Sequence, residues 1–315
     1  MPIDNSIAAY NGLALATLDI LRNLWYRREY QAHDPIFPPE IEQIIFIHAQ
    51  TFARRDKKAI LNLVLVAKRV HTWLIPKLFE TITFRSFGPY NGPLKYPVKW
   101  KNHDLIKYGK YTRNFFFSIP QDDCDTYPPH QYLIRCPNIT KLFLGLGTGF
   151  LDQGEIESLL PLPLTHLSMD LDTVLGEPRP ELIQLYSRVT HLESVEGFTP
   201  EYGLNLMYFT SLTHLAIPDI DRGRHTDLSL QILFKCLPTL RVLALLTLHT
   251  TTMGLTGEFN PTLDDPRIVR MTIVRAKRVD AWLLDVEEGR GMWGLADEAV
   301  GERKKLKKAG TVNLS

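Results

Sequence analysis

The sequence predicts an α/β protein: a short N-terminal helical module followed by a solenoid of parallel strands with helices on its outer side. A six-residue pattern, apolar-x-x-apolar-x-apolar, recurs between residues 139 and 273, and a short helical pattern precedes most of its copies. Units that run from helix to strand with one polarity can stack only with their strands parallel. Each unit has an apolar face that it cannot bury alone, so neighbouring units must cover one another.

Composition sets the protein class. With 315 residues, 44% hydrophobic and 23% charged, the chain is globular and long enough for one elongated domain or two compact ones. A formal net charge of +1 argues against nucleic-acid binding, which needs a basic excess. Cys124, Cys136 and Cys236 are too scattered for a disulfide framework, which favours the cytoplasm or nucleus. No apolar run is long enough for a membrane span, so we expect no membrane partner.

The N-terminal region contains two predicted elements. Residues 1–34 include apolar residues at helical spacing between Leu13 and Trp25, which predicts an amphipathic helix. Residues 35–82 predict a module of three short helices. The first opens at Pro38-Pro39, the second covers residues 60–68, and the third ends at Pro76. Such a module has little core of its own and must pack on something else.

Three stretches of this module resemble an F-box or F-box-like domain of the kind common in fungal proteins: Phe37-Pro38-Pro39-Glu40-Ile41, residues 65–69 and residues 76–82. The resemblance implies that the three helices dock on the Skp-type adaptor of a cullin-RING ubiquitin ligase. It also implies the adaptor-binding residues, namely Phe37, Pro38, Ile41, Ile44, Leu61, Leu65 and Trp73. The alternative is that these helices simply cap the following domain. Apolar residues left over after packing would favour adaptor binding.

Residues 83–279 predict the solenoid. The copies of the pattern begin at Ile139, Leu164, Val189, Leu212, Leu240 and Ile268, which are 25, 25, 23, 28 and 28 positions apart. This is the leucine-rich-repeat period, and the region resembles the irregular leucine-rich-repeat domain downstream of many F-box modules. Residues 79–84 and 112–117 look like earlier, degenerate copies. We expect the hydroxyls of one recurring column to bond turn backbone in adjacent units, namely Thr140, Thr165, Thr190 and Thr213.

A second column is expected to face away from the aliphatic side of the strands. It comprises Lys141, His166, His191, His214, Val242 and Arg270. Because neighbouring strands lie about 4.8 Å apart, three imidazoles should stack in a row. We expect an exposed ladder that binds an unknown protein substrate and gains charge below about pH 6.5. A metal site is the weaker alternative, because a flat ladder offers no tetrahedral geometry and Glu193 is expected on the other face.

Residues 280–315 predict a C-terminal capping helix and a basic tail. Trp293 is the expected anchor, because the ends of a solenoid need atypical caps. Residues 303–308 are almost all basic. They read as a solvated helix end, with a nuclear-localisation patch as the alternative.

No catalytic motif is present in the sequence. Gly145-x-Gly147-x-Gly149 follows a strand pattern, but Phe150 stands where a dinucleotide fingerprint needs glycine, so a glycine-rich turn is the preferred interpretation. We therefore expect a non-catalytic protein without a cofactor. The expected function is substrate recognition in a Skp-cullin-F-box type ubiquitin ligase, and the alternative is a stand-alone interaction protein.

Overall fold

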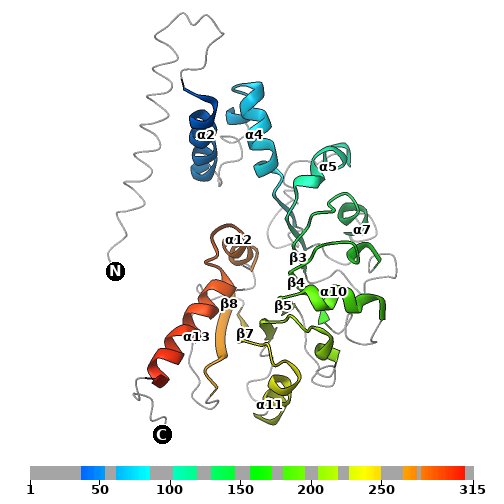
Figure 1. Cartoon of the computed structure of the whole chain (residues 1–315), viewed down its shortest axis with the longest axis vertical. Helices are drawn as coiled ribbons and strands as arrows, with labels where there is room; N and C mark the ends of the chain where they lie inside the picture. The colour runs from blue at the N-terminus through cyan, green and yellow to red at the C-terminus, as the bar shows by residue number, and fades with distance from the viewer. Residues whose placement is uncertain are drawn as a thin grey trace, which may run out of the picture. The chain divides into compact units, whose positions relative to one another are not determined.

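The computed structural model describes residues 37–53, 62–85, 102–118, 129–145, 157–171, 180–195, 205–218, 227–249, 265–274 and 278–308 (Figure 1). The chain divides into two compact units, Met1–Phe79 and Glu80–Ser315. The predicted helix within residues 1–34 lies outside the described residues, as do Leu61, Gly147 and Gly149. No described helix has the length and apolar character needed to cross a bilayer.

The first unit contains two helices, α2 (Pro39–Ala53) and α4 (Lys68–Leu78), joined in part by a helical turn at 62–64. Helix α2 begins as expected from the Pro-Pro pair: the carbonyl of Pro38 accepts the backbone N–H groups of Ile41 and Glu42. The second predicted helix is wrong beyond residue 64. Ala67 takes an extended conformation, with φ −158° and ψ 155°, and a new helix starts at Lys68.

An ion pair joins the two helices. Arg69 binds Glu42 with two hydrogen bonds, Nε to Oε2 at 2.6 Å and Nη2 to Oε1 at 2.9 Å, and the Glu42 side chain is buried. This planar, two-point geometry is the strong form of a salt bridge. Helix α4 runs through Pro76 to Leu78 rather than ending at Pro76. The proline lies in the last turn, so it removes only one hydrogen bond of the helix.

The second unit is α/β, with one open sheet of eight parallel strands in sequential order. The strands are β1 (Thr81–Arg85), β2 (Asn114–Ser118), β3 (Lys141–Leu144), β4 (His166–Met169), β5 (His191–Ser194), β6 (His214–Pro218), β7 (Val242–His249) and β8 (Ile268–Val274). All eight follow the predicted pattern. Most begin two residues late, because the first apolar residue and the threonine form the turn before the strand.

The threonine column forms the predicted hydrogen bonds. Each hydroxyl donates to the carbonyl of the preceding unit, at 3.2 Å for Thr140 and Thr165 and 3.1 Å for Thr190 and Thr213. The same carbonyls also accept two backbone N–H groups of the next unit; that of Thr165, for example, accepts from Thr190 and His191. These bonds hold successive turns in register.

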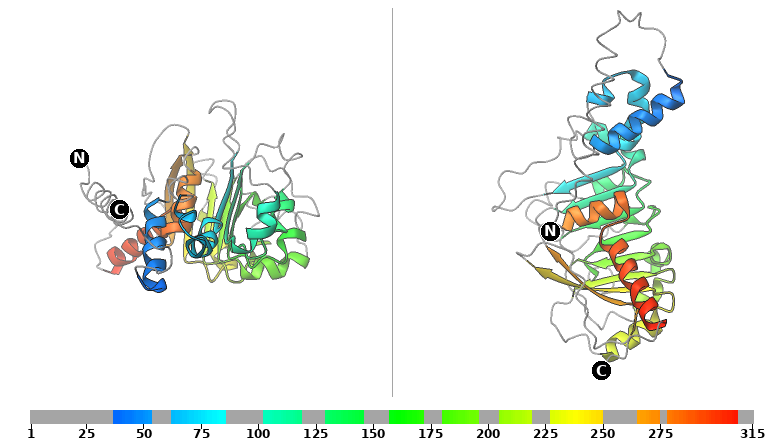
Figure 2. Two further views of the ribbon diagram at one scale, coloured as in Figure 1. Left: turned by 90° about the horizontal axis from the view of Figure 1, so that it is seen from above. Right: turned by 90° about the vertical axis from the view of Figure 1, so that its left-hand side faces the viewer.

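One face of the sheet carries the aliphatic core. Side chains such as Leu142, Leu167, Leu192, Leu215 and Leu243 are at most 1% exposed and form one continuous cluster. Short helices cover this face: α5 (Asn102–Tyr108), α7 (Pro129–Leu133), α10 (Ile183–Arg188) and α11 (Asp227–Cys236). Figure 2 shows these helices on one side of the strands and the C-terminal helices on the other.

Two C-terminal helices, α12 (Arg278–Glu288) and α13 (Met292–Lys308), cover the opposite face. Met292, Ala296 and Val300 of α13 pack with Val242 of β7, Met271 of β8 and their apolar neighbours. Trp282 of α12 packs with Phe116, Phe143 and Val195. The expected cap at the end of the sheet is therefore a cover over its face. The reason is that apolar side chains on this face need burial as well.

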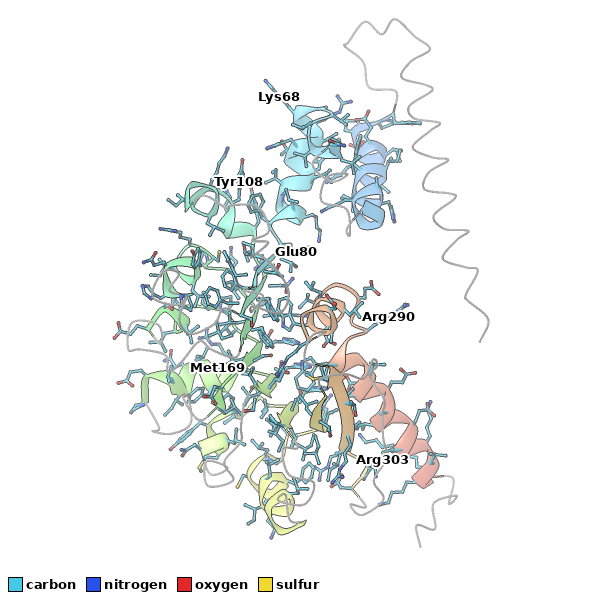
Figure 3. All side chains as sticks on the ribbon, turned by 180° about the vertical axis from the view of Figure 1, so that it is seen from behind. Lys68, Glu80, Tyr108, Met169, Arg290 and Arg303 are labelled. Carbon is cyan, nitrogen blue, oxygen red and sulfur yellow. The ribbon has the colours of Figure 1, made fainter. Side chains whose placement is uncertain are left out.

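A glycine turn connects α12 to α13 next to Arg290, which is labelled in Figure 3. Gly289 has φ +64°, and its N–H bonds the carbonyl of Asp285 while that of Arg290 bonds Leu284. The bond from the Gly289 N–H to the carbonyl four residues back is that of the αL helix ending, which favours glycine. A Cβ at Gly291 would run into the carbonyl oxygen of Ala281. Close approach of the two helices therefore requires a glycine there.

Candidate functional site

The first unit leaves large apolar side chains exposed. Ile41 is 44% exposed, Ile44 53% and Leu65 80%, and Phe37 and Pro38 are exposed as well. Trp73 is half-buried. Val66 is also exposed, and the sequence analysis did not single it out. Exposed Glu40 and Gln43 flank the α2 residues. Apolar side chains therefore remain beyond what packing uses in the described part of this unit.

On the second unit, the predicted imidazole stack is present. The register pairs Lys141 with His166, His166 with His191 and His191 with His214. The rings of His166 and His191 are stacked with centroids 4.0 Å apart and 6° between planes, and those of His191 and His214 are 4.0 Å apart at 8°. The regular column of the sequence thus becomes a ladder across three strands.

Arg270 does not belong to this ladder. It pairs with Leu245, while Ile268 pairs with Leu243, so the last copy of the pattern is displaced by three residues relative to the others. An odd displacement moves every side chain to the opposite face of the sheet. The prediction that Arg270 extends the column is therefore wrong, and Val242 is its last described member.

The prediction of an exposed ladder is also wrong, because α12 and α13 cover it. His214 is buried, and its Nε2 lies 3.1 Å from Oδ1 of Asp297 on α13. The Trp293 ring stands edge-on against His191 and His214, with centroids 5.3 and 5.7 Å away. His166 and His191 are only partly accessible. A role of Lys141 and the three histidines in target binding stays a prediction.

Burial changes the chemistry of the histidines. Burial, with further contributions from Lys141 and the other imidazoles of the ladder, lowers the pKa of His166 to about 3 and that of His191 to about 2. The expectation that these two rings gain charge below pH 6.5 is therefore wrong. Both rings are neutral at physiological pH, so each has one nitrogen that carries a proton and one that does not.

The threonine hydroxyls determine which nitrogen carries the proton. Nδ1 of His166 lies 2.9 Å from the hydroxyl of Thr165, and Nδ1 of His191 lies 2.9 Å from that of Thr190. Each hydroxyl donates its only proton to a carbonyl of the preceding unit. The imidazole must then donate from Nδ1, which leaves the lone pair on Nε2. Neither Nε2 has a partner among the described residues.

A cavity of about 200 Å³ lies between the ladder and the two helices. The strands contribute its floor, with Lys141, His166, Ser168 and His191. Its other lining residues come from α12, α13 and the turn between them, and include Trp282, Asp285, Trp293 and Asp297. The cavity therefore combines a cation, two carboxylates, two neutral imidazoles and two indoles.

Asp285 lines the cavity and bonds the beginning of α13. Its Oδ1 accepts the backbone N–H of Trp293 at 3.0 Å, and the N–H groups of Gly294 and Met292 also bond its carboxylate. Burial raises the pKa of Asp285 to about 6 in spite of these bonds. Burial lowers the pKa of Lys141, and the charge of Asp285 opposes that change. The carboxylate thus accepts the first N–H groups of α13 and, without an ion pair, favours the charged form of Lys141.

A buried ion pair fixes α12 beside the cavity. Arg278 Nη2 lies 2.5 Å from Oε1 of Glu193, and Nη1 donates to the carbonyl of Val195 at 3.2 Å. Glu193 lies two positions after His191 and shares its face, contrary to the expectation from the sequence. Removing one partner of such a pair would leave an uncompensated buried charge. The pair therefore anchors the beginning of α12 to β5.

The helix residues of this site were not found by sequence reasoning, apart from Trp293. Arg278, Asp285 and Asp297 occupy ordinary charged positions of two short helices, with no motif around them. The one usable signal was the glycine-rich turn, residues 289–291, which places two helices close together.

Comparison with known proteins supplies no further identification. No family model, curated protein or solved structure matches this chain.

Proposed function

We propose that this protein is a non-catalytic protein–protein adaptor, namely a substrate-recognition subunit of a Skp-cullin-F-box type ubiquitin ligase. In this proposal the helices of the first unit bind a Skp-type adaptor, and the second unit binds a protein substrate. The observation that carries it is the exposed apolar set of the first unit, with Ile41, Ile44 and Leu65 among its members. These are residues that the F-box resemblance assigns to the adaptor interface.

The size of the exposed set supports an interface. Burying a large aliphatic side chain contributes roughly 1.5–3 kcal/mol. Phe37, Ile41, Ile44, Leu65 and Val66 are all exposed on one small unit. Burying several of these side chains together supplies free energy of the order that a stable complex needs, since a micromolar dissociation constant corresponds to about 8 kcal/mol. Several large apolar side chains exposed on one small unit support the proposal that a partner covers them.

The outer helical layer is a second candidate for the substrate surface, because α12 and α13 cover part of the strand face. Exposed aliphatic side chains recur in the outer helical layer, once in most units, as Ile106, Ile134, Ile183, Met207 and Ile232. Exposed cations accompany them, including Lys110, Arg113 and Arg188. This layer supports binding of a protein substrate both for a ligase subunit and for a stand-alone interaction protein.

The test is direct binding of a purified Skp-type adaptor to the full chain and to an Ile41→Asp/Leu65→Asp variant. We expect binding by the parent and a loss of about 100-fold or more in the variant, because two apolar anchors are replaced by carboxylates. The matched control is Ile106→Asp/Ile134→Asp, which changes two exposed isoleucines of the second unit and should leave adaptor binding unchanged.

Two outcomes separate the alternatives, and a third calls for another variant. Equal binding by a folded Ile41→Asp/Leu65→Asp variant would refute the assigned interface. No binding by the parent would favour the stand-alone interaction protein. Should the double variant lose its helical circular dichroism, the single change Leu65→Ser takes its place, because Leu65 is 80% exposed and its loss does not open a core.

A further inference from the structure

Four groups of the cavity between the sheet and α12–α13 have unused hydrogen-bonding capacity. Within the described residues, the ammonium of Lys141 makes no hydrogen bond or ion pair, and the Nε2 atoms of His166 and His191 accept none. The hydroxyl of Ser168 has no partner there either, although the residue is buried. Lys141, His166 and His191 are half-buried and line the cavity, so a polar ligand there would find free donors and acceptors within reach.

The open groups are arranged by charge across the strands. Lys141 on β3 forms the positive end. The negative end is Asp297, which lies beside His214 of β6, and its Oδ2 has no partner among the described residues. Three strand spacings separate β3 from β6, or about 14 Å between backbones. Two neutral imidazoles that present acceptors lie between these ends.

We propose that this cavity binds a small zwitterion, with the ligand carboxylate at Lys141 and its ammonium at Asp297 and the imidazole Nε2 atoms. The ammonium supplies the N–H donors that the two Nε2 lone pairs and Oδ2 of Asp297 lack, and the carboxylate supplies the acceptor that Lys141 lacks. The ligand's charges must be separated by several bonds, as they are in a dipeptide. Two extended residues span about 7 Å, which is about half of the backbone separation and leaves the remainder to the two side chains.

Other ligand classes fit less well. A simple anion would find one ammonium, because both partly accessible imidazoles are neutral. A metal ion needs converging lone pairs, whereas the rings of His166 and His191 are parallel at 4.0 Å, and no group of three ligands converges within the described part of the chain. A nucleotide is too large, since pockets for drug-sized ligands measure about 300–1,000 Å³ and this cavity about 200 Å³.

Asp285 does not block the carboxylate end. Its carboxylate accepts three backbone N–H groups at the beginning of α13, so its charge is already compensated. The indoles of Trp282 and Trp293 line the cavity and supply apolar walls for the uncharged middle of the ligand. Their fluorescence provides a local signal for occupancy.

The experiment titrates the full-length protein with L-alanyl-L-alanine and follows both the heat of binding and tryptophan fluorescence. We expect saturable binding with a dissociation constant between about 10 μM and 1 mM, as befits a ligand with few heavy atoms. The N-acetylated dipeptide removes the ammonium, and the dipeptide amide removes the carboxylate. Each should bind at least about tenfold more weakly, because each loses a charge-assisted hydrogen bond.

Variants assign the two ends of the cavity. Lys141→Met should weaken the free dipeptide about tenfold but leave the amide unchanged, and Asp297→Asn should weaken it similarly but leave the N-acetyl form unchanged. The matched controls are Glu298→Gln and Lys304→Met, which change exposed charges of α13 outside the cavity. They should bind like the parent.

Several outcomes would overturn the proposal. Absence of saturable binding up to about 10 mM dipeptide would overturn it, because the affinity would then be too weak for specific recognition. Equal binding of the capped dipeptides would show that the charges are not recognised. The capped ligands test both ends in the unmodified protein, so the conclusion does not depend on any variant folding. The result is independent of adaptor binding, which uses the first unit.

Discussion

The two faces of the eight-stranded sheet are covered by different parts of the chain. The aliphatic face is covered by the helices of the repeats themselves, and hydrogen bonds between adjacent turns join residues 23 to 27 positions apart. The other face is covered by α12 and α13. There, Arg278 reaches Glu193 over 85 positions and Asp297 reaches His214 over 83. One face is therefore built from near neighbours and the other from a distant segment.

This difference explains the chemistry of the faces. Every strand contributes at least one buried apolar side chain to the first face, mostly leucines, with phenylalanines in β1 and β2, so this core is apolar throughout. The second face must match two particular helices, and it mixes stacked imidazoles, a buried ion pair and apolar clusters. A cavity with open polar groups occurs on the second face. Specific chemistry has arisen where the cover is not part of the repeat.

The largest expected contrast comes from two neighbouring residues of β5 that point to opposite faces. Leu192→Ala removes a side chain with no exposed surface from the aliphatic core, and we expect a loss of about 3 kcal/mol in the free energy of unfolding. His191→Ala removes a partly accessible ring beside a cavity and should cost about 1 kcal/mol. Urea unfolding measures both. Equal losses would mean that the two faces contribute alike.

The second contrast concerns acid. The folded pKa values of His166 and His191 lie far below the unfolded value, so between pH 6.5 and about 3 the unfolded chain binds more protons at these rings. Stability from both rings is therefore present above pH 6.5 and lost as pH falls. Asp285 acts in the opposite direction, because its pKa is raised to about 6 and its cost is relieved below that pH.

We expect the parent to lose about 2 kcal/mol between about pH 7 and pH 4.5 through these groups, after allowance for partial solvent access. The charged and titratable groups around the two rings are Lys141, Glu193, His214, Arg278, Asp285 and Asp297. His166→Gln/His191→Gln should flatten the stability profile in this range, and Asp285→Asn should steepen it. Parallel profiles for the parent and the double histidine variant would contradict the assignment of neutral buried rings.

The smallest expected effects come from glycines of α13 and the turn before it. Gly291→Ala should cost about 1–2 kcal/mol, because the new methyl group meets the backbone of α12. Gly301→Ala meets nothing within 4 Å and should stabilise by about 0.5–1 kcal/mol through helix propensity. Thermal unfolding of the two variants compares them. A stabilising Gly291→Ala would show that the two helices are not held in close contact.

Much of the fold was predictable because one sequence pattern recurs many times along the chain. The strands, the outer helices and the threonine hydrogen bonds all follow from a pattern whose copies agree with one another. The errors occurred where a copy deviates. The segment from Ile268 has the same apolar pattern as the other copies, but it pairs with β7 three residues out of register. The pattern of a single sequence does not fix the register of strand pairing.

The candidate site was less predictable for a related reason. The order of Lys141 and the three histidines across the strands could be predicted, because it depends only on neighbouring units. Its burial depends on α12 and α13, which pair with it through contacts between residues about 85 positions apart, such as Glu193 and Arg278. Nothing in the spacing of charged residues on a helix says which surface they will meet.

The late position of α12 and α13 in the chain also bears on how the protein is made. The strands from β2 to β8 leave the ribosome before residues 278–308, so Phe116, Phe143 and their neighbours on this face are synthesised without their cover. At about 5–20 residues per second, the delay between Phe116 and Val300 is roughly ten to forty seconds. During that time the nascent chain presents an apolar sheet face. We expect it to rely on chaperones that hold such surfaces until synthesis is complete.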